Sequence, residues 1–225
     1  EPVYQAVSSV VSQINKCNQV HSGDNSEKNI ADENILYENT SYKNTAEEIK
    51  NHNARLIYVT PQGSVFNQQM AKEFAKEEDL IFLCGHYEGI DERVLEETVT
   101  DYVSIGDYVL NGGEVAVSVM LEAITRLLPG FMGNAASIVE ESYTGENALL
   151  EHRQYTKPAD WRGIKVPDVL LSGDHAKVDR FRRDEALAKT NKLRPDLIEA
   201  LDCSKLDKAD RKTLMALGWE VSGAH

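Results

Sequence analysis

The pattern of hydrophobic and polar positions divides the chain into a first part, in which strands alternate with helices, and a last part that is mainly helical. Short apolar runs typical of buried strands occur at 55–60, 79–84 and 99–105. Helical periodicity follows each run and predicts helices after Asn67, at 91–97 and at 114–128. Strands that alternate with helices predict an α/β fold with a mainly parallel sheet.

The regions on either side of this alternation have different patterns. Residues 3–14 place five apolar side chains on one helical face, whereas 18–53 is rich in Asn and Glu and predicts a polar surface insertion. After residue 172 the periodicity predicts a small, mostly helical C-terminal domain, with helices near 174–190, 196–201 and 207–217. We therefore predict three parts, namely a cofactor-binding domain over 1–132, a linker over 133–150 and a helical domain over 151–225.

Composition narrows the class of protein. The chain has 225 residues, of which 41% are hydrophobic, so it can bury a core. No apolar run reaches the roughly 18 residues that span a bilayer, so we expect no membrane contact. Three widely spaced cysteines form no CxxC pair, so no zinc site is expected. With no secretory leader pattern in the sequence, these features predict a cytoplasmic protein.

Charge is distributed unevenly along the chain. The formal net charge is −13, which argues against non-specific binding to nucleic acid. Residues 151–225, however, carry 15 Lys and Arg against 13 Asp and Glu, and the basic excess is greatest at 177–194. A local basic face can still contact phosphates, and Arg182 and Arg183 are the candidate RNA-binding residues. The alternative is a solvated helix face with no ligand.

Three glycine-containing segments follow the three predicted strands, at 60–63, 85–89 and 106–113. The carboxyl ends of parallel strands meet at one edge of a sheet, where ligands bind. Glycine lets a ligand approach the backbone closely, so the three loops together predict a pocket. The alternative is that each segment is an ordinary tight turn.

The composition of the loops restricts the ligand. The sequence has no G-x-G-x-x-G dinucleotide fingerprint and no P-loop, and the loops have almost no Lys or Arg that could neutralise phosphates. Acidic residues in and near the loops would suit a positively charged ligand; they are Glu88, Asp91, Glu92, Asp107 and Glu114. S-adenosylmethionine has a sulfonium and no phosphate, so it meets both conditions.

Two further positions have simple structural explanations when taken alone. Arg126 is the only Lys or Arg between Arg93 and Arg153, and it falls in the last turn of a predicted helix, where it would interact with the helix dipole. Glu140 and Glu141 follow it in the predicted linker, where acidic residues are ordinarily solvated.

The segments Tyr58-Val59-Thr60-Pro61-Gln62-Gly63, 84–93 (CGHYEGIDER) and 104–114 (SIGDYVLNGGE) resemble the bacterial tRNA (guanine-N1)-methyltransferases, in order and in spacing. The later segments 155–158 and 171–175 are also similar to motifs of that family. The resemblance covers most of the chain from residue 55 to about 201, and three long motifs in register make it specific.

The resemblance implies a fold, a cofactor and a substrate. The fold would be the trefoil-knotted domain of the SPOUT class, in a homodimer with its active site across the interface. The substrate would be the guanine immediately 3′ of the anticodon in tRNA, methylated at N1. The family's S-adenosylmethionine positions fall on Tyr58, Val59, Thr60, Pro61, Gly63, Gly85, Tyr87, Glu88, Gly89, Ser104, Ile105, Gly106, Asp107, Tyr108, Val109, Leu110, Gly112 and Gly113.

The resemblance also changes the interpretation of the two isolated positions. Arg126 falls on the family's catalytic arginine, and Glu141 takes the place of its usual aspartate general base. Glutamate keeps the carboxylate and adds one methylene. The implied mechanism has Glu141 accepting the N1 proton while Arg126 stabilises charge on O6. The family also suggests an assisting magnesium ion, for which no set of ligands is recognisable in the sequence.

Some features leave the function open. The family resemblance predicts a further segment before Glu1, with a glycine-rich loop and the first strand of the sheet. Two alternatives therefore remain. The chain could act as a knotted RNA methyltransferase on another base, or as a non-catalytic fragment that binds cofactor or RNA.

Overall fold

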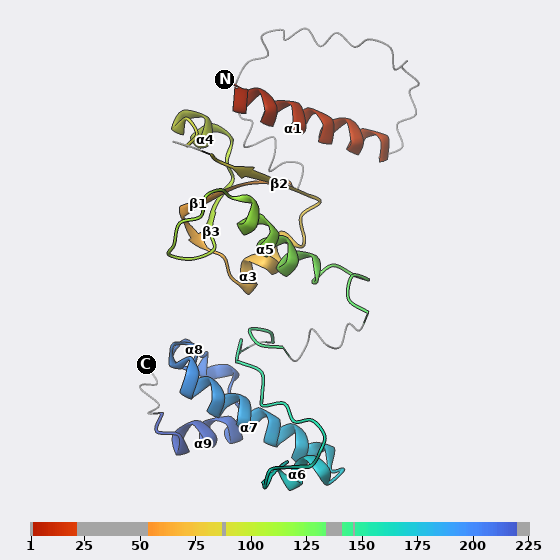
Figure 1. Ribbon diagram of the computed structural model, residues 1–225, viewed down its shortest axis with the longest axis vertical. Helices are drawn as coiled ribbons and strands as arrows, with labels where there is room; N and C mark the ends of the chain where they lie inside the picture. Colours follow the sequence, from red (N-terminus) through yellow and green to blue (C-terminus); the bar gives the residue numbers. More distant parts are fainter. Residues whose placement is uncertain (1, 22–53, 87–88, 134–140, 146, 220–225) are drawn as a thin grey trace. The chain divides into compact units, whose positions relative to one another are not determined.

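The computed structural model describes residues 2–21, 54–86, 89–133, 141–145 and 147–219 of the chain. The chain forms two compact units, Glu1–Met132 and Gly133–His225. Figure 1 shows the elements of each unit, coloured along the sequence.

The first unit contains a three-stranded parallel sheet in the order β2-β1-β3. The bounds of its strands are β1 Ala54–Val65, β2 Asp79–Cys84 and β3 Asp101–Ser104. Its helices are α1 Pro2–His21, α3 Gln68–Phe74, α4 Glu92–Thr98 and α5 Glu114–Thr125. The α/β class with a parallel sheet, predicted from the alternating pattern, is confirmed.

Consecutive residues of β1 face opposite sides of the sheet, because side chains alternate along a strand. Leu56 packs in a cluster with Val7 of α1 and Leu95 of α4, whereas Ile57 packs with Phe74 of α3 and Met120 of α5. Two helices therefore cover each face of the sheet, α1 and α4 on one side and α3 and α5 on the other (Figure 1). The buried β1 strand is central in both clusters, which explains its apolar sequence.

Local signals set the start of α3. The side-chain oxygen of Asn67 accepts hydrogen bonds from the backbone N–H groups of Gln69 and Met70, both at 3.0 Å. These bonds satisfy two of the donors that a helix start leaves unpaired. The helix predicted after Asn67 is therefore confirmed, and Asn67 is its N-cap.

The end of β1 differs from the prediction. The apolar run at 55–60 predicts a strand that gives way to a loop at 60–63, but pairing with β3 resumes at Ser64. Val59 lies opposite Val103, the register then shifts, and Ser64 lies opposite the same Val103. Residues 60–63 therefore form a bulge in the strand, because pairing with β3 on its far side holds the chain in the sheet.

The second unit is mostly helical. Its helices are α6 Asp168–Leu171, α7 His175–Leu193, α8 Pro195–Glu199, the 3-10 turn η2 Cys203–Lys205 and α9 Lys208–Ala216. The core consists of Leu187 from α7 with Leu149, Ile198, Leu201, Leu206 and Leu214. A two-stranded antiparallel hairpin, β4 Asp160–Trp161 and β5 Ile164–Lys165, was not predicted from the sequence.

Parts of two predicted segments belong to the elements beside them. Residues 18–21, assigned to the polar insertion, continue α1, and 22–53 lies outside the described residues. Within the predicted linker, Leu149 belongs to the core of the second unit, and the backbone N–H of Leu150 donates to Thr190 Oγ1 at 3.0 Å. The end of that stretch therefore packs as part of the second unit.

Candidate active site

The loops that follow the three strands meet at one cleft of about 200 Å³ in the first unit. It lies at the carboxyl edge of the parallel sheet, the usual place for a ligand in such folds. Its described lining consists of Tyr58, Val59, Thr60, Pro61, Gly85, His86, Gly89, Ser104, Ile105, Gly106, Tyr108, Leu110, Asn111, Gly112, Gly113 and Ala116.

Most of the predicted cofactor-binding residues that the structure describes line this cleft, but three of them do not. Gly63, Asp107 and Val109 lie outside the lining, and Tyr87 and Glu88 lie outside the described residues. Val109 is 83% exposed. Three further residues line the cleft: His86, Asn111 and Ala116. The first two lie inside the loops 85–89 and 106–113 that the sequence predicts to form the pocket, whereas Ala116 belongs to α5, outside those loops.

Gly63 has a structural role in the bulge. A Cβ atom at this position would overlap the backbone of Tyr102 and Val103 in β3. Only glycine lets the two strands come this close, so Gly63 shapes the first loop without lining the cleft.

The second and third loops also approach each other closely. A Cβ atom on Gly113 would lie 2.9 Å from the sulfur of Cys84, and one on Gly85 would lie 3.1 Å from the hydroxyl of Tyr58. Gly106 has φ +147, and its N–H donates to Ser104 Oγ at 3.1 Å. Gly85 and Gly113 therefore let the loops pack closely beside the cleft, where a Cβ would collide with neighbouring atoms.

The cleft carries little charge. Among its described lining residues none is Asp, Glu, Lys or Arg. The nearby carboxylates that suggested a cationic ligand have other partners: Asp91 caps α4 and pairs with Arg93, and Glu114 Oε1 lies 2.6 Å from His86 Nε2. A hydrogen bond from its own backbone N–H, and then the one with His86, lower the pKa of Glu114.

Cys84 ends β2 beside the cleft. Burial, and then the negative charge of Glu114, raise the pKa of its thiol. A thiol with a raised pKa is protonated at neutral pH and is a poor nucleophile. The site is therefore unsuited to covalent catalysis by this cysteine.

The two predicted catalytic residues lie in different units. Arg126 is the half-buried C-cap residue of α5 in the first unit. Glu141 lies in the second unit, where its backbone oxygen accepts a hydrogen bond from the backbone N–H of Thr144 at 3.2 Å. Glu140 lies outside the described residues.

A second cleft, of about 290 Å³, lies within the second unit and contains Glu141 in its lining. Arg182 and Arg183, the predicted RNA-binding residues, line the same cleft. The remaining lining residues are Thr144, Gly145, Asn147, Leu149, Leu150, Glu151, His152, Asp179 and Ala186. The structure thus brings the predicted general base and the predicted RNA-binding arginines together.

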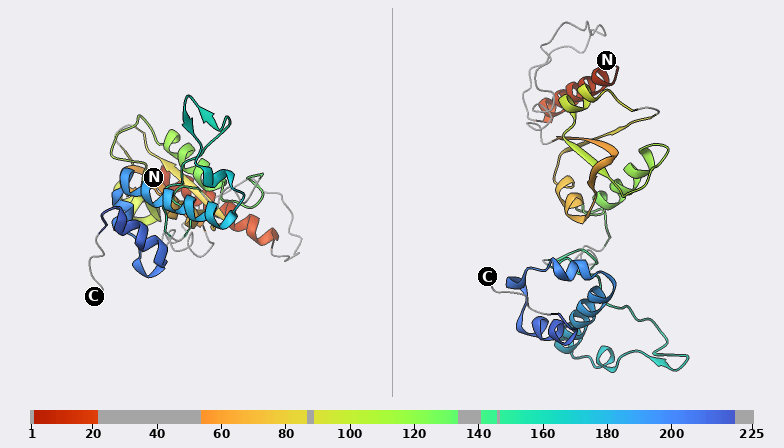
Figure 2. Two further views of the ribbon diagram at one scale, coloured as in Figure 1. Left: turned by 90° about the horizontal axis from the view of Figure 1, so that it is seen from below. Right: turned by 90° about the vertical axis from the view of Figure 1, so that its left-hand side faces the viewer.

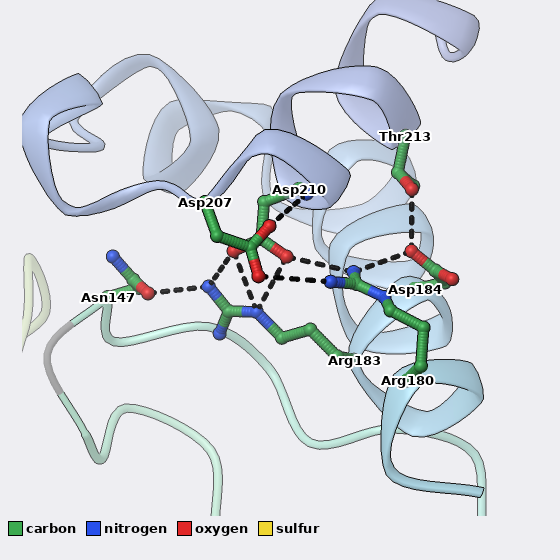
Figure 3. A network of polar contacts seen from close by, with 7 residues as sticks. All are labelled: Asn147, Arg180, Arg183, Asp184, Asp207, Asp210 and Thr213. Carbon is green, nitrogen blue, oxygen red and sulfur yellow. Dashed lines mark hydrogen bonds and ion pairs between the residues drawn. The ribbon is translucent and has the colours of Figure 1, made fainter. Parts of the chain in front are cut away.

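The two arginines differ in their partners. Arg183 donates from Nη2 to Asp210 Oδ2 at 2.8 Å and also bonds Asn147 Oδ1 (Figure 3). Arg180 donates to the same Asp210 at 2.8 Å and to Asp184 at 2.6 Å. For Arg182, no ion pair is found within the part of the chain that the structure describes. Arg183 is therefore held in a network that joins α7 to α9.

Asp210 is the buried centre of this network, with only 5% of its side chain exposed. Burial raises the pKa of Asp210, but hydrogen bonds from Arg183 and Arg180 lower it by more, so the net shift is downward. The carboxylate therefore remains ionised inside the unit, where the two arginines balance its charge.

The described ranges contain neither a metal-binding cluster nor a membrane-spanning helix. In these ranges no three His, Cys, Asp or Glu residues are grouped so that they could hold a metal ion. No described helix is both long enough and apolar enough to cross a bilayer.

Comparison with known proteins identifies the family. Residues 30–200 match the family described as tRNA (Guanine-1)-methyltransferase TrmD. A tRNA (guanine-N(1)-)-methyltransferase of Bifidobacterium adolescentis is 80% identical over 176 residues, covering 76% of this chain and 57% of the relative. The protein of the same name from Bifidobacterium longum subsp. infantis is 71% identical over 176 residues, covering 76% of this chain and 65% of the relative.

A more distant relative has the same name. This tRNA (guanine-N(1)-)-methyltransferase, from Lachnoclostridium phytofermentans, is 58% identical over 154 residues, covering 68% of this chain and 55% of the relative. The chain thus spans between 55% and 65% of the length of these three relatives. The family match covers well over half of the chain, and this chain therefore belongs to the tRNA (Guanine-1)-methyltransferase TrmD family.

Proposed function

We propose that this chain uses S-adenosylmethionine to methylate N1 of the guanine immediately 3′ of the anticodon in tRNA. The observation that carries the proposal is the meeting of three glycine loops at one cleft without charged residues in its described lining. Family membership adds the reaction, since the relatives are named as tRNA (guanine-N(1)-)-methyltransferases.

The residues of the cleft fit this cofactor. Gly85 and Gly113 let the second and third loops pack closely beside Tyr58 and Cys84, where a Cβ would collide, and this close packing would place loop backbone N–H and C=O groups beside an adenine and a ribose. The lining described lacks Lys and Arg, which a phosphate-bearing nucleotide would require. S-adenosylmethionine, when bound, supplies an electrophilic methyl group on a sulfonium. Leu110 and Tyr58 would contact its apolar parts.

Two residues would act on the guanine. N1 of guanine carries a proton and is a poor nucleophile, so a base must remove the proton. Glu141 would accept it, because a carboxylate is the group that the family uses at this position. Arg126 would donate hydrogen bonds to O6, where negative charge develops as the proton leaves.

The tRNA contacts would come from the second unit. Arg182 lines the same cleft as Glu141 and would contact a phosphate near the target guanine. Arg183 is committed to Asp210 and Asn147, so we now assign it a supporting role in this contact. The target base would be splayed out of its stack to reach Glu141.

We further propose that the enzyme is a homodimer with the family's knotted fold, working in the cytoplasm, with its active site across the interface. An exposed apolar face on the first unit supports the dimer. Val115 and Val119 lie one turn apart on α5 and are 65% and 48% exposed, and Val109 and Phe131 are also exposed. Exposed apolar side chains that share one helix face, as Val115 and Val119 do, are typical of a protein interface.

Isothermal calorimetry tests the cofactor half of this proposal. We expect S-adenosylmethionine to bind, whereas NAD and ATP should not, because their phosphates meet no basic residue among the described lining residues. Binding of ATP or NAD without any response to S-adenosylmethionine would overturn the assignment of the cleft.

A further inference from the structure

The β4–β5 hairpin of the second unit has a defined geometry although it is short. Trp161 pairs with Ile164 in antiparallel register, and the two residues between them form the turn. Arg162 and Gly163 both have positive φ, 56 and 84, as a tight two-residue hairpin turn requires. The carboxylate of Asp160 accepts a hydrogen bond from Gly163 N at 2.8 Å, which fixes the turn.

This hairpin exposes large apolar side chains. Trp161 is 57% exposed and Ile164 is 66% exposed. The hairpin extends away from the helices of its unit in both views of Figure 2. The guanidinium of Arg162 lies over the indole of Trp161, with 5.0 Å from Cζ to the ring centroid. An exposed tryptophan beside a planar cation presents a flat aromatic surface together with positive charge.

The charge of the segment indicates the chemistry of the partner. Residues 153–165 carry four Lys and Arg against one Asp, in a chain with a net charge of −13. The carboxylate of Asp160 already accepts the hydrogen bond from Gly163 N, and Arg153 pairs with Glu185 at 3.2 Å. Within the ranges that the structure describes, no ion pair is found for Lys157, Arg162 or Lys165. The hairpin is therefore a locally basic surface around an exposed aromatic ring.

We propose that the hairpin tip is an RNA-docking surface, on which an unpaired base of the tRNA stacks against Trp161 while Arg162 and Lys165 contact the flanking phosphates. Aromatic rings with neighbouring cations are the usual platform for unpaired bases, because every base has a flat π-face and a charged backbone. This inference rests on the proposed function for the identity of the RNA. It assigns the hairpin a binding contact and no part in the chemical step.

Binding of a tRNA transcript to the full chain tests the proposal. Replacing a stacking aromatic by Ala costs about 1–3 kcal/mol per base, so Trp161→Ala should weaken binding by about 5- to 150-fold. Trp161→Phe keeps a flat ring and should retain most of the affinity. Met215→Ala is the matched control, because Met215 is 62% exposed in the same unit but belongs to α9. It should bind as the parent does.

Two further readouts separate stacking from a purely structural role. Trp161→Ala should leave the slope of log affinity against log salt unchanged, whereas Arg162→Ala and Lys165→Ala should each reduce it by about 0.7–0.9. The chain has two tryptophans, and Trp219 packs against the helical core. Addition of tRNA should therefore quench the fluorescence of the parent, and Trp161→Phe should lose most of that quenching.

The outcomes distinguish this inference from the proposed function. Parental tRNA affinity in Trp161→Ala would overturn the hairpin proposal, even if methyl transfer proceeds normally. Weakened RNA binding in Trp161→Ala, in a parent that transfers no methyl group, would support the hairpin and refute the enzyme. If Trp161→Ala changes the oligomeric state of the chain in solution but not its RNA affinity, the hairpin serves self-association. That result would overturn the RNA contact.

Discussion

The guanidinium of Arg183 donates to the carboxylate of Asp210, from Nη2 to Oδ2 over 2.8 Å and from Nε to Oδ2 over 3.2 Å. Arg183 belongs to α7 and Asp210 to α9, so this contact joins two helices that are distant in sequence. Arg183, which the charge pattern alone predicts to bind RNA, is therefore part of the internal structure of the second unit.

Arg183→Ala should therefore lower the stability of the second unit. Removing one partner of a buried, hydrogen-bonded carboxylate costs about 1–3 kcal/mol, and Arg180 remains to satisfy part of Asp210. Urea unfolding monitored by circular dichroism measures this loss. Arg182→Ala is the matched control, since it removes the same charge from the same helix, and it should change the free energy of unfolding by less than Arg183→Ala. Equal stability of the two variants would contradict the structural role.

The same contact predicts a pH dependence of stability. The pKa of Asp210 is lower in the folded chain than its usual value, so the unfolded chain binds the proton first as pH falls. The stabilisation is complete above the ordinary pKa of aspartate, about 4, and is lost as pH falls through the folded pKa. Melting temperatures between pH 7 and pH 2.5 should fall less steeply for Asp210→Asn than for the parent. Parallel curves would show that Asp210 does not contribute.

Sequence patterns predicted the parts of the fold that short-range rules decide. The bounds of β2 and the cap at Asn67 follow from a bounded apolar run and from a side chain that satisfies nearby N–H groups. The pocket loops could be located because parallel strands place their carboxyl ends at one edge.

The features that were missed depend on residues far apart in the sequence, or on a weak local signal. The bulge at 60–63 exists because β3 pairs with β1 on both sides of it, which a local stop signal such as Pro61 cannot reveal. The partner of Arg183 lies 27 residues away, so the charge pattern could not distinguish a structural arginine from an exposed one. The hairpin turn at Arg162-Gly163 did have a signal, a glycine in a two-residue turn between Trp161 and Ile164.

Gly113→Ala should disrupt cofactor binding. The added Cβ would lie 2.9 Å from the sulfur of Cys84 and 3.1 Å from its Cβ, so the third loop would have to move away from β2. We expect at least a tenfold loss of affinity for S-adenosylmethionine, equivalent to about 1.4 kcal/mol. Gly133→Ala is the control, because a Cβ there meets no atom within 4 Å. Calorimetry on both variants checks this, and parental affinity in Gly113→Ala would contradict the assignment of the cleft.

Glu141→Gln should slow the chemical step while leaving cofactor affinity unchanged. Glutamine has the same size but cannot accept the N1 proton, and losing a general base costs about 10²–10⁴ in rate. Glu141→Asp should also be slower, since its shorter side chain would not reach the same point. Single-turnover methyl transfer at saturating tRNA and cofactor measures both rates. A Glu141→Gln rate within a few-fold of the parent would exclude Glu141 as the base and make Glu140 the next candidate.

Arg126→Ala provides the companion measurement in the same assay. Loss of a donor to developing oxygen charge typically costs on the order of 10²–10³ in rate. Arg126 does not line the cleft of the first unit, so the affinity of the Arg126→Ala variant for S-adenosylmethionine should stay at the parental value. A large loss of cofactor affinity with little change in rate would move Arg126 from the chemical step to the cofactor site.

The most direct test is methyl transfer by the chain itself. Two tRNA transcripts that differ only in the base 3′ of the anticodon, guanine or adenine, are incubated with the chain and labelled S-adenosylmethionine, and the products are digested to nucleosides. Our account predicts 1-methylguanosine from the first transcript and no labelled nucleoside from the second. Cofactor and tRNA binding without label transfer, or label on any other base, would contradict it.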